Sequence, residues 1–212
     1  MCHPAVRFRH HRLDPATRLY LDYLTWDGSP NVTLQRPDYV VPANRRTASG
    51  LASNMWRMAW VNGVDQYDWW WPEAYRLVQN EGRGLLIQGT RDWQDYQVEA
   101  EITPHLAKTA GIAARVQGMR RYYALLLCDD AKVRLIKALD GDQVLAEADF
   151  AWSMGTAYTF TLRVEGHRLT AAIDGNILYT GEDEERPLTG GGVAFVCEVG
   201  RIMSEAMRVQ PI

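Results

Sequence analysis

The chain has 212 residues, of which 47% are hydrophobic, and a formal net charge of −3 from 23 basic and 26 acidic residues. This apolar content with nearly balanced charge excludes an intrinsically disordered chain. The charge balance also gives no general attraction to nucleic acid or to an anionic membrane, and no apolar run reaches the roughly 18 residues that a membrane-spanning helix needs. We expect a globular protein with no nucleic-acid partner and no membrane partner.

The N-terminus and the cysteines bear on the compartment. Met1–Asp14 is basic and rich in histidine, and it lacks the apolar segment of a secretory signal. Cys2, Cys128 and Cys197 are too few and too scattered for a disulfide framework or a cysteine zinc site. These features favour a cytoplasmic location by default. A start that leads straight into a strand, with no helix signal, also fits a chain cut from a larger protein.

The first third of the chain differs from the rest. Arg18–Trp26 alternates between apolar and polar residues, which predicts a strand. Gln35–Ser53 contains proline, glycine, asparagine and paired arginine and is expected to be a loop. We therefore predict a small N-terminal β extension with its loop over residues 1–54, packed on a main domain over residues 55–212.

The remaining two thirds consist of short strand-like segments. In Tyr96–Ile102 apolar residues alternate with polar ones, which is the period of a half-buried strand. Asp140-Gly141 and Asp174-Gly175 supply the positive φ angles of tight hairpin turns. Many short strands joined by hairpins predict an all-β protein, an antiparallel β-sandwich of the jelly-roll type. Further strands are expected over 75–80, 84–88, 111–117, 121–128, 132–138, 143–150, 158–164, 168–173, 177–180, 192–198 and 202–209.

Several of these segments carry a resemblance to a known superfamily. They include Gly84–Ile87 leading to Trp93, Gly111–Val116, Tyr158–Leu162 after Trp152, and Gly190–Phe195. In this order the chain from Tyr75 onward resembles the concanavalin A-like lectin/glucanase superfamily, in the branch with laminin-G-like domains, family 66 carbohydrate-binding modules and 3-keto-disaccharide hydrolase domains. The resemblance implies a concanavalin A-like sandwich. It does not choose an activity, because the fold hosts lectins, glycosidases and interaction modules.

The N-terminal segment resembles something different. Leu19–Leu24 followed by Trp26–Gly28 is similar to the last strand of a galactose-binding-like jelly roll. The whole arrangement is similar to the β-sandwich region appended to some bacterial ADP-ribosylglycohydrolase-like proteins. That similarity implies a catalytic domain of the same parent protein as a partner.

Glu99 and Glu101 are the candidates for catalysis. They stand two residues apart on one face of a predicted strand, and retaining glycosidases need two carboxylates roughly 5 Å apart. Their flanking sequence does not match the glucanase pattern, so a polar, solvent-facing strand side is the alternative. The chain has no Ser/His/Asp set, phosphate-binding loop or HExxH motif. The sequence thus leaves open whether the protein is an enzyme.

The polar side of the sheet is the first candidate ligand surface. If apolar residues alternate inward, Arg115 and Gln117 face outward beside Glu99. Fixed planar groups of this kind bind sugars through paired hydrogen bonds. In the resembled families the arginine of this strand and the following tyrosine pair lie close to the ligand face, which points to Arg115 and Tyr122. The alternative is that Arg115 and Glu99 form a cross-strand ion pair on the sheet surface and bind no ligand.

The tryptophans form the second candidate. Five of the eight lie between residues 56 and 71, and three of them are consecutive, Trp69–Trp71. Neighbours on a strand point to opposite faces, so these three cannot all enter one core. Trp70 and Trp71 are therefore candidates for stacking on a sugar ring or for an interface with the N-terminal piece. Trp93 and Trp152 are expected in the core or at sandwich corners.

No cofactor is expected, although sandwiches of this type can hold a structural calcium through carboxylates and carbonyls. Asp92, Asp129, Asp130 and Asp174 are candidates by residue type alone. The acidic run Glu182–Glu185 is expected to be a solvated loop. The favoured function is a non-catalytic module that binds or positions a glycan. The alternatives are a glycoside hydrolase of the 3-keto-disaccharide type using Glu99 and Glu101, and a structural module that holds a catalytic domain.

Overall fold

The computed structural model of the protein describes residues 60–68 and 74–212, which form twelve strands and no helix. None of the described residues therefore belongs to a helix that could cross a membrane. The predicted N-terminal extension over 1–54, and Trp70 and Trp71, lie outside the described residues. The strands are β1 (Val61–Gly63), β2 (Gln66–Asp68), β3 (Tyr75–Gln88), β4 (Tyr96–Gly118), β5 (Arg121–Cys128), β6 (Lys132–Leu139), β7 (Asp142–Asp149), β8 (Tyr158–Glu165), β9 (Arg168–Ile173), β10 (Asn176–Glu182), β11 (Gly192–Ser204) and β12 (Met207–Pro211).

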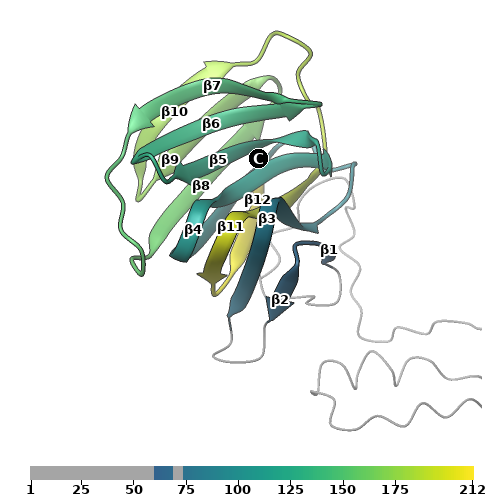
Figure 1. The fold of residues 1–212 in the computed structure, drawn as a ribbon. Helices are drawn as coiled ribbons and strands as arrows, with labels where there is room; N and C mark the ends of the chain where they lie inside the picture. The colour runs from purple at the N-terminus through teal and green to yellow at the C-terminus, as the bar shows by residue number, and fades with distance from the viewer. Residues whose placement is uncertain (1–59, 69–73) are drawn as a thin grey trace, which may run out of the picture. The chain divides into compact units, whose positions relative to one another are not determined.

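The strands form two layered sheets in which every pairing is antiparallel (Figure 1). Sheet I has the order β1-β3-β11-β4-β5-β6-β7, with β2 also paired to β3. Sheet II has the order β12-β4-β8-β9-β10. The predicted all-β sandwich is confirmed, and the hairpin turns at Asp140 and Asp174 have the positive φ angles expected there, 58° and 50°.

Strand β4 belongs to both sheets. Its first part, Tyr96–Ile102, pairs with β8 and β12 in sheet II, and its later part pairs with β5 and β11 in sheet I. The sequence predicted two separate neighbouring strands here. They are one strand because the intervening residues stay extended. Their clean alternation is lost where the register against β11 shifts, between Arg201 and Ile202, so the sequence pattern looks interrupted there.

The main core lies between the two sheets. It contains Phe160 from sheet II and Phe195 and Leu77 from sheet I, all fully buried. Trp60 belongs to this core, because its ring stacks on Phe195 at 5.5 Å between centroids and its Nε1 donates to the Tyr75 hydroxyl at 3.3 Å. Trp60 is therefore a packing residue. Trp93 and Trp152 also pack against this core, as predicted.

A second buried apolar cluster covers the face of sheet I that is turned away from sheet II, here called the outer face. Successive residues of a strand alternate between these faces, so Leu86 enters the main core while Leu85 enters the outer cluster. This double burial explains why Arg121–Cys128 reads as an almost continuous apolar run. The outer cluster contains Leu85, Ala113, Val116, Tyr122, Ala124, Leu126, Cys128, Ile136, Ala138, Ala194 and Val196.

Gly111 tests how tightly the centre of sheet I is packed. A Cβ on Gly111 would lie 2.0 Å from the carbonyl oxygen of Leu125 on β5, and backbone cannot yield cheaply. We expect Gly111→Ala to lower the free energy of unfolding by about 1–3 kcal/mol, measured by urea denaturation. Gly141→Ala is the control, since a Cβ there meets nothing within 4 Å. Equal stability of the two variants would contradict this packing.

Candidate functional site

Arg115 does not face solvent as the strand pattern predicted. It adopts φ of 50°, in the left-handed region that L-residues rarely occupy, and the β4–β5 register shifts between Ala114 and Gly118. This bulge turns the arginine inward and rotates Val116 into the outer cluster instead. The side chain of Arg115 is 1% exposed, so the predicted outward placement is wrong.

The guanidinium of Arg115 is held by a set of buried acceptors. Nη1 donates to the carbonyl oxygens of Leu188 at 2.5 Å and Gly166 at 2.6 Å, and Nε donates to that of Gln94 at 3.3 Å. Nη2 pairs with Asp95 Oδ1 at 3.1 Å. Burial lowers the pKa of this guanidinium below its ordinary value, and the charge of Asp95 acts against that shift. Arg115 therefore joins β4, the β8–β9 turn and the loop after β10, and makes no ion pair with Glu99.

Tyr96 and Gln117 make further hydrogen bonds in the same region, where the loop after β10 leads into β11. The Tyr96 hydroxyl accepts from the backbone N–H of Arg115 at 2.6 Å and lies 2.8 Å from the Gly192 carbonyl oxygen. Gln117 donates through Nε2 to the Gly190 carbonyl oxygen at 2.8 Å. Gln117, a predicted ligand residue, is thus already engaged with the loop that follows β10.

The acidic run Glu182–Glu185 is not fully solvated, because Asp183 is buried. Its Oδ2 lies 2.7 Å from Lys137 Nζ, with side-chain exposures of 4% and 2%, and accepts a hydrogen bond from the Tyr123 hydroxyl at 2.5 Å. Burial raises the pKa of Tyr123, and this hydrogen bond to Asp183 acts in the same direction. The Tyr123 hydroxyl also accepts from the Leu188 N–H at 2.9 Å. We call Lys137, Asp183 and Tyr123 the latch, since together they fasten the loop after β10 to sheet I.

Tyr122, the other first candidate, is also inaccessible. Its ring lies in the outer cluster and the residue is 3% exposed. Its hydroxyl oxygen accepts from Arg83 Nη1 at 3.3 Å. Arg83 in turn pairs with Glu198 at 3.1 Å and with Asp142 at 2.7 Å. Tyr122 therefore positions Arg83, and Asp142 is the most exposed side chain of this group.

Glu99 and Glu101 lie on the face of sheet II that is turned away from sheet I. Glu99 stands opposite Thr161 on β8, and its Oε1 is 3.7 Å from Arg208 Nη1 on β12. This surface matches the predicted polar, solvent-facing side of the strand. Neither glutamate lines either of the two cavities described next, so the structure does not place them in a cleft.

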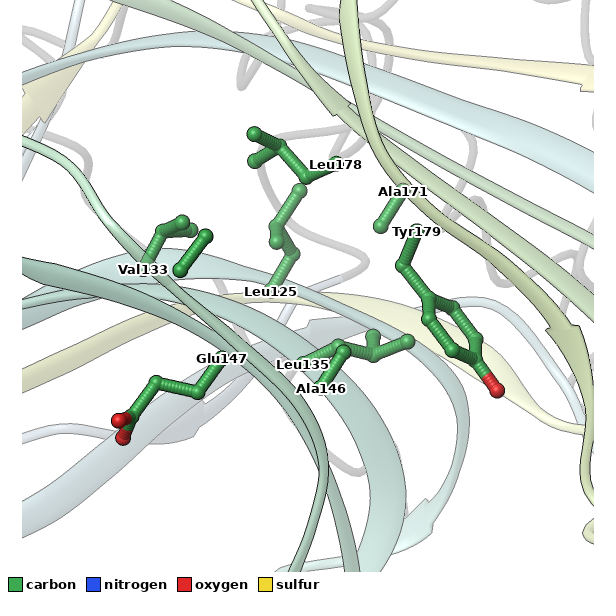
Figure 2. Close-up of a pocket in the computed structure, with 9 residues that line it drawn as sticks. Leu125, Val133, Leu135, Ala146, Glu147, Ala171, Leu178 and Tyr179 are labelled. Carbon is green, nitrogen blue, oxygen red and sulfur yellow. The ribbon is translucent and has the colours of Figure 1, made fainter.

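The first cavity lies between the open edges of the sheets, where β7 faces β10. Leu125, Leu135 and Leu178 converge on it, whereas the carboxylate of Glu147 points away (Figure 2). Its volume is about 10 Å³, which holds no more than one water molecule. This cavity is a packing gap of the core and has no room for a ligand.

The second cavity is a polar hollow of about 280 Å³ between the β6–β7 turn and the loop after β10. The start of β7 contributes Asp142 and Gln143, and the loop contributes Glu185 and Arg186. Arg186 has φ of 54°, a strained backbone conformation of the kind that collects at functional sites. Lys137 of the latch, Leu139 and Gly141 complete the lining. The sequence missed this site because its walls come from segments more than 40 residues apart.

Two of the calcium candidates are engaged with protein groups. Asp174 Oδ1 accepts the Thr159 N–H at 2.7 Å, and Asp130 pairs with Arg134. Over residues 60–68 and 74–212, no group of three or more His, Cys, Asp or Glu side chains could hold a metal ion. Of the cysteines there, Cys128 and Cys197 are free and buried, and burial raises the pKa of Cys197 to about 12.

No protein-family model matches the sequence, and no curated protein matches it. Solved structures match the fold. The carbohydrate binding module CBM66 from Bacillus subtilis has a TM-score of 0.64 at 13% identity, over 72% of this chain and 95% of that one. A Bacillus subtilis protein of unknown function with a galectin-like fold has 0.58 at 13% identity, over 72% and 89%. The GH43 protein BlXynB from Bacillus licheniformis has 0.55 at 11% identity, over 73% of this chain and 37% of its own.

These likenesses confirm the predicted fold, a concanavalin A-like β-sandwich of the kind that lectin-like and carbohydrate-binding proteins share. At such low identity they show the fold alone. The site must therefore be argued from the side chains themselves, and of the two cavities described above the polar hollow is the one with room for a ligand.

Arg115→Lys tests whether this arginine is structural. Lysine keeps the charge but cannot supply the planar set of donors that Arg115 uses, which leaves buried carbonyl oxygens without partners. We expect a loss of about 2–4 kcal/mol in the free energy of unfolding, measured by urea denaturation. A variant with unchanged stability and lost ligand binding would instead restore Arg115 as a binding residue.

The latch allows a sharper test. Lys137→Met should cost about 3–5 kcal/mol, because it leaves the buried Asp183 carboxylate without a cation. The double variant Lys137→Met/Asp183→Leu should recover most of that loss, since no buried charge remains. Removing the exposed pair partner Arg163 by Arg163→Ala should change stability by less than about 1 kcal/mol. A double variant less stable than Lys137→Met would refute the latch.

Proposed function

We propose that the protein is a non-catalytic carbohydrate-binding module that binds a glycan in the polar hollow between the β6–β7 turn and the loop after β10. The observation that carries this proposal is a polar cavity of about 280 Å³, lined in part by the side chains of Gln143, Glu185 and Arg186, which bind no other described residue. The likeness of the fold to the carbohydrate binding module CBM66 supports the class of ligand.

The lining of the hollow suits sugar hydroxyls, which both donate and accept hydrogen bonds. Gln143 and Arg186 supply donors, while Glu185 and Asp142 supply acceptors. No hydrogen bond or ion pair joins the side chains of Gln143, Glu185 or Arg186 to another described residue. Leu139 adds an apolar surface for the C–H face of a sugar ring. The hollow can thus recognise a neutral polyol through several directed contacts.

The walls of the hollow are held in place before a ligand arrives. Asp142 is oriented by Arg83, and the loop that carries Glu185 is held by Lys137, whose Nζ donates to the Glu185 carbonyl oxygen. A fixed wall lowers the entropy lost on binding. The buried residues that the sequence proposed as ligands therefore contribute by shaping the hollow. A catalytic domain elsewhere in the parent protein is the partner that such a module would serve.

One other binding site and one other function remain as outcomes of the tests. The outer face of sheet II, with Glu99 and Arg208, offers a flat polar surface to a glycan. Glu99 and Glu101 on that face would also be the carboxylates of a glycoside hydrolase. The polar hollow is preferred because a concave site surrounds its ligand and excludes more water than a flat strand surface does.

Substitutions in the hollow test the proposal. We expect Gln143→Ala and Asp142→Asn each to weaken binding of a sugar, found by screening neutral oligosaccharides, by about tenfold or more. Isothermal titration calorimetry gives the affinity. Glu99→Gln is the matched control and should bind like the unaltered protein. If Glu99→Gln abolishes binding while both hollow variants retain it, the site is the outer face of sheet II.

The same oligosaccharides test catalysis. Incubation with the protein should release no shorter products, as followed by mass spectrometry. Hydrolysis that disappears in Glu99→Gln would overturn the non-catalytic assignment and establish the hydrolase.

A further inference from the structure

Beyond the bulge of β11, the outer face of sheet I carries two arginines side by side. Leu77 and Ile202 are paired across β3 and β11, and both point into the main core. Their neighbours Arg76 and Arg201 therefore point outward on the same face. They are diagonal neighbours in the register, a relation that places Cα atoms roughly 7–8 Å apart. Two guanidinium groups thus reach the same patch of surface.

Among the residues whose side chains the structure describes, none forms an ion pair or a side-chain hydrogen bond with Arg76 or Arg201. His105, the bulged residue of β4, lies within reach of both. Burial lowers the pKa of its imidazole, and the charges of Arg201 and Arg76 lower it further.

Apolar side chains border these cations. Leu106 is 66% exposed and lies opposite Arg201 in the register of β4 and β11. Val199 is 42% exposed and has φ of 41°, an unusual conformation for a β-branched residue. The bulge keeps this conformation because Gly200 beside it packs directly on the Leu106 backbone, where a Cβ would lie 1.6 Å from the carbonyl oxygen. Strained backbone conformations cluster at functional sites, so an exposed, strained valine near these arginines indicates a surface that binds another molecule.

We propose that this surface, the Arg76–Arg201 face, binds the carboxylate groups of an acidic glycan, a second site separate from the polar hollow. The proposal rests on the proposed function only in taking a glycan as the class of ligand. Each planar guanidinium can hold one carboxylate through two parallel N–H···O bonds. Leu106 and Val199 offer apolar contacts to the C–H face of a neighbouring sugar ring.

The composition of the face favours this ligand over other polyanions. Nucleic-acid binding proteins commonly neutralise about 6–10 phosphates, whereas this face has two unpaired arginines and Lys108, which already pairs with Glu198 at 3.4 Å. Membrane attachment needs a larger apolar surface than Leu106 and Val199 provide. A short uronic acid oligosaccharide needs no more than the face supplies.

The test compares an oligogalacturonate with its methyl ester, in which each carboxylate is replaced by an uncharged ester. We expect the full-length protein to bind the acid at least tenfold more tightly than the ester, with the difference shrinking as salt rises. Arg76→Gln/Arg201→Gln should remove that preference and leave the fold unchanged, as judged by thermal unfolding. Arg208→Gln, an exposed arginine on sheet II, is the matched control and should keep it.

The outcomes separate this inference from the proposed function. Equal binding of the acid and its ester, or an unchanged preference in the double variant, overturns the Arg76–Arg201 face while leaving the hollow intact. Duplex DNA and phosphatidylserine vesicles are tested in the same way. If either binds as tightly as oligogalacturonate and loses that binding in the double variant, the inference is also overturned, because the face is then a general polyanion surface. Asp142→Asn should leave the acid preference unchanged. If no glycan of either kind binds, both proposals fail together.

Discussion

A buried arginine ties the two sheets of this sandwich to the loop that builds its polar hollow. The donors of Arg115 are shared among the carbonyl oxygens of Gln94, Gly166 and Leu188 and the carboxylate of Asp95. A buried cation is tolerated only when its donors are satisfied. The loop after β10 must therefore pass close to the Arg115 bulge, and the latch fixes the same loop a few residues earlier. The position of Glu185 and Arg186 follows from these two attachments.

The course of the long strands β4 and β11 determines where the polar contacts around Arg115 form. Because β4 crosses from sheet II to sheet I, residues near both of its ends approach the loops at one end of the sandwich. The bulge at Arg115 and the bulge next to Val199 each break the alternation of a strand and turn one residue against the pattern. The first bulge directs a charge into the interior. The second leaves an apolar side chain on the surface, beside Arg201.

The two proposed surfaces differ in how the protein prepares them. The hollow is preorganised by buried charges, so substitutions at Arg115 or Lys137 would alter binding through the fold. The Arg76–Arg201 face is built on the sheet itself, and its arginines keep their charges unpaired. Stability and affinity should therefore change together for the latch residues and separately for the side chains that meet a ligand.

Alternation and turn residues in the sequence were enough to predict an antiparallel sandwich, most strand positions and the Asp140 and Asp174 turns, since these depend on neighbours along the chain. They also placed Glu99 on an exposed face. Alternation failed for Arg115, the resemblance did not foresee the burial of Tyr122, and the acidic run did not foresee that of Asp183. Their burial depends on a bulge, on the second apolar face of sheet I and on a cation from β6. Only the tertiary structure brings Lys137 to Asp183 and places Asp142 and Arg186 around one hollow, because these residues are distant in sequence and come together through packing of the sheets.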